Sequence, residues 1–139
     1  MLQQIYPSTT HPYQFELNKD FNFSAGHHIP CEEAGICQNV HGHTYFVNLT
    51  IVGDKLDDTG FLVNFSHLKK MIHGKFDHQL LNNLPAFKNK IPSTEIVAET
   101  IYQIVKENLA SLEHQPKCIQ VFVRETPTSY VVFRPKEQV

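Results

Sequence analysis

The chain is poor in cysteine and arginine and has no long hydrophobic run. Its three cysteines, Cys31, Cys37 and Cys118, are odd in number and irregularly spaced, which argues against a disulfide framework. Only Arg124 and Arg134 are arginines, and 12 Lys and Arg residues against 14 Asp and Glu do not indicate a nucleic-acid-binding surface. No apolar run approaches the roughly 18 residues that span a bilayer, and the N-terminus lacks the features of a signal peptide. We therefore expect a soluble, cytoplasmic protein without nucleic-acid or membrane partners.

The length favours a single folded domain. A chain of 139 residues can bury a core without disulfides or a structural metal. Repeats, low-complexity tracts and linker-like stretches are absent, so we expect one domain over residues 1–139, with residues 1–13 as an N-terminal arm. Any metal in such a protein is expected to serve function rather than folding.

Hydrophobic periodicity predicts an α+β protein. Apolar and polar residues alternate in two long segments of the first half, as in strands with one buried face. Helical spacing follows Asn64, which can cap a short first helix, and Ser93 can cap a second, longer helix that begins in the sequence PSTE. We expect strands over residues 15–27, 40–52, 119–125 and 130–133. The order ββααββ indicates an antiparallel sheet with helices on one face.

The third predicted strand carries an acidic residue at the end of an apolar face. Strand periodicity places Ile119, Val121, Val123 and Glu125 on the same side. An unpaired buried carboxylate is costly, so a glutamate in this position suggests a function.

Three histidines are predicted to meet at one end of the first hairpin. His27 ends the first strand and His41 begins the second, while His43 shares the face of His41 because side chains two residues apart point the same way. Three imidazoles with no fourth protein ligand in the pattern are typical of a catalytic zinc site with an open position. Iron, nickel and copper also accept imidazole ligands. His28 is expected to point to the opposite face of the strand. Four other histidines have no cluster of candidate ligands near them in the sequence: His11, His67, His73 and His114.

Cys37 lies in the connection between these two strands, four residues before His41. Three interpretations are open: a fourth zinc ligand, an acid or base beside a bound substrate, or an inert thiol. A cysteine near a cation ionises more readily and can then accept a proton at neutral pH. The pattern alone does not separate the first two interpretations.

The motifs resemble those of a known family. FSAGHHIP, CQNVHGHTY, FDHQLLN, PSTE and VRET follow one another in the order found in the 6-pyruvoyltetrahydropterin synthase / QueD family, and the resemblance extends from about Phe15 to Arg134. It implies that zinc is bound by His27, His41 and His43. Its other implied site residues are Cys37 as proton acceptor, His78 with Asp77 as the second acid/base group, and Glu125 as the pterin anchor and a member of the proton relay.

The implied roles make chemical sense. A carboxylate accepts two neighbouring N–H donors of an aminopyrimidinone at once, which suits Glu125. Asp77 and His78 are adjacent in sequence and cannot face each other in a strand, so their shared role requires an irregular turn. Departures from the family pattern are Asn64 where Asp is common, Ser93 in place of Thr, and His28 where Arg is frequent. The cysteine at position 37 argues against the folate-type relatives, which carry Glu there.

The resemblance also implies a fold and an activity. Such proteins adopt the tunnelling fold (T-fold), in which sheets of several subunits close into a barrel, typically a homohexamer with sites between subunits. The implied activity is a zinc-dependent lyase that converts 7,8-dihydroneopterin triphosphate to 6-carboxy-5,6,7,8-tetrahydropterin, releasing acetaldehyde and triphosphate, on the way to queuosine. The alternative is a 6-pyruvoyltetrahydropterin synthase, which retains the three-carbon side chain. A rival of another class is a non-catalytic zinc-binding module with Cys37 as the fourth ligand.

Overall fold

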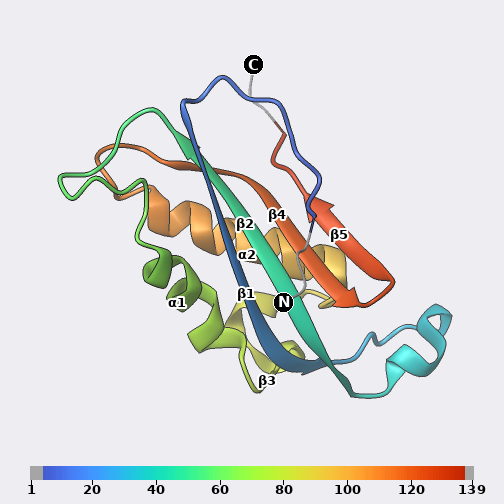
Figure 1. Ribbon diagram of the computed structural model, residues 1–139. Coiled ribbons are helices and arrows are strands. Elements are labelled where there is room, and N and C mark those ends of the chain that lie inside the picture. Colours follow the sequence, from blue (N-terminus) through green and yellow to red (C-terminus); the bar gives the residue numbers. More distant parts are fainter. Residues whose placement is uncertain (1–4, 137–139) are drawn as a thin grey trace.

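The computed structural model describes residues 5–136, in which one sheet and two α-helices form two layers (Figure 1). The strands are β1 (Phe15–His27), β2 (His41–Gly53), β3 (Gln79–Leu80), β4 (Lys117–Thr126) and β5 (Ser129–Phe133). The helices are α1 (Phe65–Phe76) and α2 (Thr94–Leu109), and short 3-10 segments are η1 (Glu32–Gln38), η2 (Leu81–Asn83) and η3 (Pro85–Phe87). The predicted α+β class is confirmed.

The sheet has the order β3-β1-β2-β4-β5 and is antiparallel apart from the β3–β1 pair. The predicted order ββααββ omits β3, because a strand of two residues is too short to show a periodic pattern. β1 and β2 pair over their whole length, and His27 lies directly opposite His41. The predicted hairpin is therefore present, and the end of β1 lies beside the start of β2 as expected.

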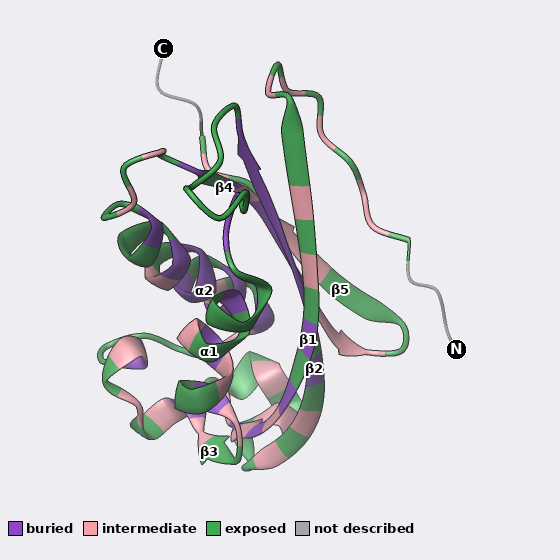
Figure 2. Ribbon diagram, turned by 60° about the vertical axis from the view of Figure 1, so that its left-hand side comes forward, coloured by how far each residue is buried: buried purple, intermediate pink, exposed green. Residues whose placement is uncertain are grey.

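Both helices cover one face of the sheet, and the core lies between the layers (Figure 2). The side chains of Asn64 and Ser93 accept hydrogen bonds from backbone N–H groups in the first turns of α1 and α2, as predicted for helix caps. The odd-numbered residues of β1 and β2 point toward the helices, with Phe23 and Tyr45 stacked at a centroid distance of 5.0 Å. His27, His41 and His43 continue this helix-facing row.

A β-bulge corrects one expectation about β4. Thr50 pairs with Gln120, but the next residue, Ile51, pairs with Cys118, so Ile119 is an extra residue. Cys118 consequently takes the core position, and the prediction that Ile119 shares the core face is wrong. The buried Val121 and Val123 keep the predicted face.

The described part of the N-terminal arm runs over the sheet face that carries no helix (Figure 1). Gln120 donates a hydrogen bond from Nε2 to the Pro7 carbonyl at 2.7 Å, and Tyr6 packs edge-on against Phe122. Residues 1–4 of the predicted arm lie outside the described residues. Among residues 5–136, no helix has the length and hydrophobicity needed to span a bilayer.

Candidate active site

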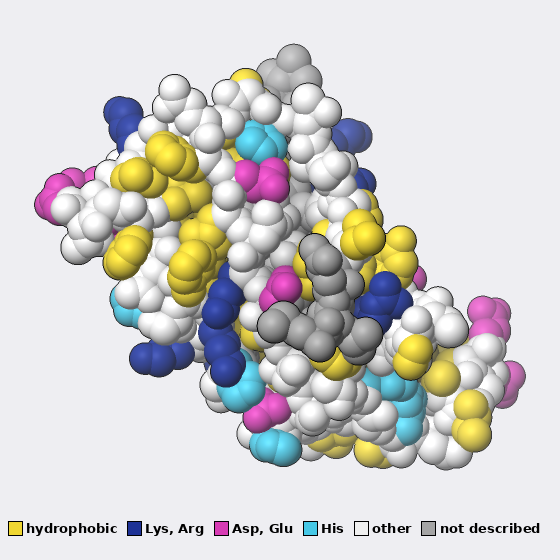
Figure 3. Space-filling view, in the orientation of Figure 1, with side chains coloured by type: hydrophobic (Ala, Val, Ile, Leu, Met, Phe, Trp, Pro, Cys, Tyr) yellow, Lys and Arg dark blue, Asp and Glu magenta, His cyan; other side chains and the backbone are white. Residues whose placement is uncertain are grey.

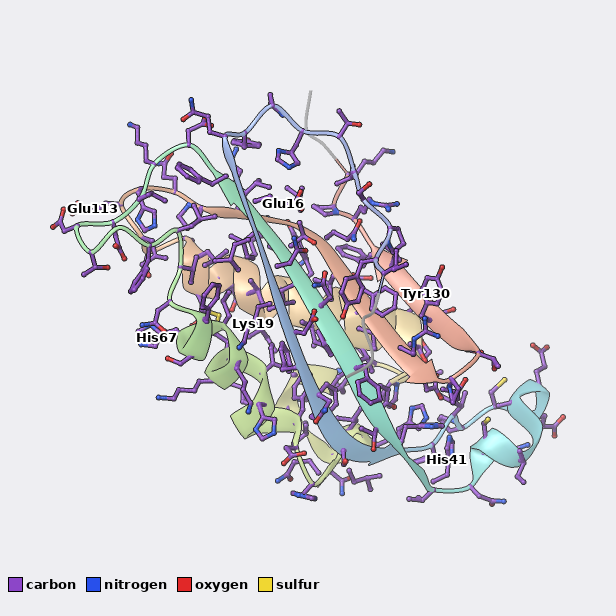
Figure 4. All side chains as sticks on the ribbon, in the orientation of Figure 1. Glu16, Lys19, His41, His67, Glu113 and Tyr130 are labelled. Carbon is purple, nitrogen blue, oxygen red and sulfur yellow. The ribbon has the colours of Figure 1, made fainter. Side chains whose placement is uncertain are left out.

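The three predicted histidines meet on the helix-facing side, where β1 ends and β2 begins. Their ring centroids lie 4.5 Å apart for His27 and His41, 5.1 Å for His27 and His43, and 4.9 Å for His41 and His43. Figure 4 labels His41 at the end of β2 that adjoins the β1–β2 connection. The strand pairing produces this arrangement, because the register His27–His41 brings together residues 14 positions apart in sequence.

Backbone carbonyls fix the orientation of two of these rings. The Nδ1 atom of His27 lies 2.7 Å from the Pro92 carbonyl oxygen, and Nδ1 of His41 lies 2.8 Å from the Asn39 carbonyl oxygen. Since a carbonyl only accepts, each Nδ1 carries the proton of a neutral ring and each Nε2 keeps its lone pair. Metal-binding histidines are held in this way.

Glu125 adds a carboxylate to the three imidazoles. Its Oε1 lies 2.7 Å from Nε2 of His43 and 3.5 Å from Nε2 of His27, and the Thr94 hydroxyl donates a hydrogen bond to Oε2. A second bulge contributes to this position: Arg124 pairs with Tyr130 and Thr126 with Ser129, so Glu125 is the extra residue of β4. The prediction that Glu125 lies on the apolar face of the strand is confirmed.

The members of the cluster shift one another's pKa values. Burial lowers the pKa of His43. Burial also lowers the pKa of His27, but its contacts with Glu125 and the Pro92 carbonyl outweigh this effect and raise the pKa overall. Contact with His27, followed by the charges of His43 and His41, lowers the pKa of Glu125. A metal ion must displace any such proton, because only the neutral imidazole and the carboxylate coordinate.

The cluster fits a metal ion. His27, His41, His43 and Glu125 each offer one ligand atom, and these four atoms lie within 4.8 Å of one another. The Nε2 atoms of His27 and His43 are buried without a hydrogen-bond partner; for His43 the short distance to Glu125 is not accompanied by hydrogen-bond geometry. Unsatisfied nitrogens of this kind are costly unless a cation binds them. The residues present are thus suited to holding a metal, as predicted from the three histidines.

Cys37 lies in η1, within the connection between β1 and β2. Its side chain is partly buried, and its carbonyl oxygen accepts a hydrogen bond of 2.8 Å from the Ile29 N–H. The sulfur is not one of the four atoms that could bind one ion. The described structure therefore does not group Cys37 with the candidate metal ligands, and its acid/base role stays a prediction.

Asp77 and His78 form a separate group at the outer edge of β1. Asp77 ends α1, and its Oδ1 accepts a hydrogen bond of 2.9 Å from the Ser24 N–H. His78 has a φ of 58° and donates its own N–H to the Ser24 carbonyl at 2.6 Å. The irregular turn required by the sequence is therefore present, and it brings His78 Nε2 to 3.4 Å from Asp77 Oδ2.

Some contacts of the site involve backbone groups and distant side chains and were not predicted from the sequence. Pro92 and Thr94, at the start of α2, contact His27 and Glu125, whereas the PSTE motif predicted only a helix cap. His73, placed outside any group by its sequence surroundings, lies with Nε2 at 3.5 Å from Asp77 Oδ2. The expectation that His73 has no constellation around it is wrong. Its spacing of four residues from Asp77 on one helix was the available signal.

The chain is similar to known tetrahydropterin synthases. The chain matches the family described as "6-pyruvoyl tetrahydropterin synthase" over residues 16–136. A 6-carboxy-5,6,7,8-tetrahydropterin synthase of Bacillus subtilis (strain 168) is 60% identical over 141 aligned residues, covering 99% of this chain and 97% of that protein. A 6-pyruvoyl tetrahydrobiopterin synthase of Dictyostelium discoideum is 30% identical over 105 residues, covering 72% and 74%. The structure of Caenorhabditis elegans 6-pyruvoyl tetrahydropterin synthase matches with a TM-score of 0.73 at 22% identity, over 88% of this chain and 96% of that one, and so shares its fold.

Proposed function

Because this chain belongs to the 6-pyruvoyl tetrahydropterin synthase family, we propose that it is a cytoplasmic 6-carboxy-5,6,7,8-tetrahydropterin synthase. The reaction takes 7,8-dihydroneopterin triphosphate and water to 6-carboxy-5,6,7,8-tetrahydropterin, acetaldehyde and triphosphate, in the pathway to queuosine. The observation that carries the proposal is the cluster of three histidines and Glu125, in a chain 60% identical to the Bacillus subtilis synthase.

His27, His41 and His43 would hold Zn²⁺ as the cofactor. Imidazole nitrogens suit zinc, and two unsatisfied Nε2 atoms are available in the cluster. When bound, the metal supplies Lewis-acid polarisation of the substrate's side-chain oxygens.

The protein's own groups would move the protons. Cys37, in the connection beside the cluster, accepts a proton from the substrate side chain, and His78 serves as the second acid/base group. Asp77 orients His78 and stabilises its charged form, as a carboxylate does for a neighbouring imidazole. Glu125 accepts N–H donors of the pterin ring while the Thr94 hydroxyl holds its second oxygen.

A homohexamer with sites between subunits would complete the pocket. The side chain of His78 is 83% exposed, and it lies on the open edge of β1, where β3 pairs only with Ala25 and Gly26. Exposed strand edges are surfaces on which further strands can pair. Each copy would contribute one T-fold domain of residues 1–139, with an arm at residues 1–13. In such an assembly, a catalytic group of one copy can reach the metal of another.

Two other functions use overlapping residues. A 6-pyruvoyltetrahydropterin synthase, which eliminates triphosphate without breaking a carbon–carbon bond, is supported by the 30% identical Dictyostelium relative. A non-catalytic zinc-binding module needs only the cluster itself. The higher identity to the Bacillus protein favours the carboxy product.

Product analysis separates these functions. We expect the zinc-loaded protein, incubated with 7,8-dihydroneopterin triphosphate and a carbonyl-trapping reagent, to yield trapped acetaldehyde and a 6-carboxy product by mass spectrometry. A 6-pyruvoyl product without acetaldehyde would replace the proposal with its alternative. Unchanged substrate, in a correctly folded and metal-loaded sample, would favour the binding module.

Glu125→Gln is expected to retain zinc and to lower kcat/KM by roughly 10- to 100-fold. The amide keeps the size of the carboxylate but loses the charge-assisted acceptor for the pterin. Metal content by mass spectrometry and steady-state kinetics measure the two effects, with the exposed Glu99→Gln of α2 as the matched control. Loss of the metal would instead make Glu125 a ligand, as its 2.7 Å distance from His43 allows.

A further inference from the structure

A second histidine contacts the carboxylate of the proposed acid/base pair. His73 lies in the last turn of α1, four residues before Asp77, and its Nε2 is 3.5 Å from Asp77 Oδ2. His78 Nε2 is 3.4 Å from the same oxygen. Two imidazoles therefore share one carboxylate oxygen, while Oδ1 is occupied by the Ser24 N–H at 2.9 Å. Figure 3 shows histidine and acidic side chains side by side at the lower end of the molecule, where α1 ends in Figure 1.

The arrangement is not a second metal site. Among residues 5–136, the group of side chains whose ligand atoms could surround one ion is His27, His41, His43 and Glu125. His73 is 34% exposed and Asp77 22%, so their pairing is accessible to water and responds to protonation. A cationic side chain is also favoured at the C-terminal end of a helix.

We propose that His73 is a positioning residue for Asp77 and His78. By contacting the oxygen that His78 uses, His73 fixes the direction of the carboxylate toward His78. The inference rests on the proposed role of Asp77 and His78 in the reaction.

Other groups also contact Asp77 and set its charge. The amide of Ser24, on β1, lowers the pKa of Asp77 most strongly, and the charges of His78, His73 and Lys69 lower it further. Asp77 is therefore a carboxylate at neutral pH. Both imidazoles therefore contact one negatively charged oxygen.

The test compares two substitutions of His73 in the full-length, zinc-loaded protein. His73→Leu removes both the contact and the charge, and we expect kcat to fall roughly tenfold with KM unchanged. His73→Gln keeps an N–H donor at a similar reach but cannot titrate, and we expect it to retain most of kcat.

Rescue by the conservative variant distinguishes this role from a structural one. If His73 acts by holding the Asp77 carboxylate, the N–H donor of His73→Gln should restore most of the kcat that His73→Leu loses, while the Tm is the same in both variants. His67→Leu, which replaces an exposed histidine of the same helix, should leave kcat unchanged.

A double variant isolates the coupling. In an Asp77→Asn background, His73→Leu should lower kcat no further, because the carboxylate that His73 contacts is already gone. An unchanged kcat in His73→Leu, with turnover still lowered in Asp77→Asn, would overturn the inference and leave the proposed function standing. Full turnover in Asp77→Asn would overturn the role of the Asp77–His78 pair as well.

Discussion

Cys37→Ala is expected to lower kcat by roughly 10²- to 10⁴-fold while leaving the bound metal in place. A positioned acid/base group contributes a factor of this size, and the sulfur lies outside the four atoms that could bind one ion. Steady-state kinetics with 7,8-dihydroneopterin triphosphate and elemental analysis of the purified variant measure the two quantities independently.

Cys31→Ala is the matched control, since Cys31 is an exposed thiol in the same β1–β2 connection. It should keep full turnover. If Cys37→Ala also keeps full turnover, the acid/base role of Cys37 is wrong. If the Cys37 variant loses zinc and unfolds, Cys37 is the fourth ligand of a binding module.

His43→Ala is expected to abolish turnover through loss of the metal. Removing an outer partner of a metal ligand already costs about 10- to 100-fold in affinity, so the loss of one of three imidazole ligands should cost more. The metal-free variant should still fold, because His43 is 17% exposed and its Nε2 makes no hydrogen bond that the fold requires. Titration with zinc, followed by a thermal melt, should therefore raise the Tm of the unsubstituted protein but not that of the variant.

His67→Ala serves as the control for histidine removal as such. His67 is exposed on α1 (Figure 4). The His67→Ala variant should therefore show the same zinc-induced rise in Tm and the same turnover as the unsubstituted protein. A normal zinc response in His43→Ala would show that His43 is not a ligand and would remove the basis of the proposed metal centre.

The three-histidine part of the cluster could be predicted because it depends on strand periodicity and on the pairing of the first two strands. Alternation placed His41 and His43 on one face, and pairing of the two predicted strands placed His27 opposite His41. The helix caps followed from local hydrogen-bonding preferences in the same way. The predicted family is confirmed by the match over residues 16–136, and the predicted tunnelling fold by the similarity to the Caenorhabditis elegans structure.

The remaining features depend on interactions that no local pattern encodes. At the bulge in β4, Cys118 occupies the core position that alternation assigned to Ile119. The register of the sheet, rather than the alternation of residues, decides which side chain is buried. β3 exists only through its pairing with β1, and the contact of Pro92 with His27 joins residues 65 positions apart. Such contacts are set by how the helices pack on the sheet.

The backbone at His78 also shows where activity and stability are in conflict. A φ of 58° is unfavourable for a residue with a side chain and is adopted freely by glycine. Glycine at this position would therefore relieve the backbone and remove the imidazole at the same time. Strained residues of this kind tend to occur at functional sites, where the rest of the structure holds them in place. A search for more thermostable variants would be expected to select changes at position 78, which would remove the proposed acid/base group, so stability screens of this protein need a parallel assay of turnover.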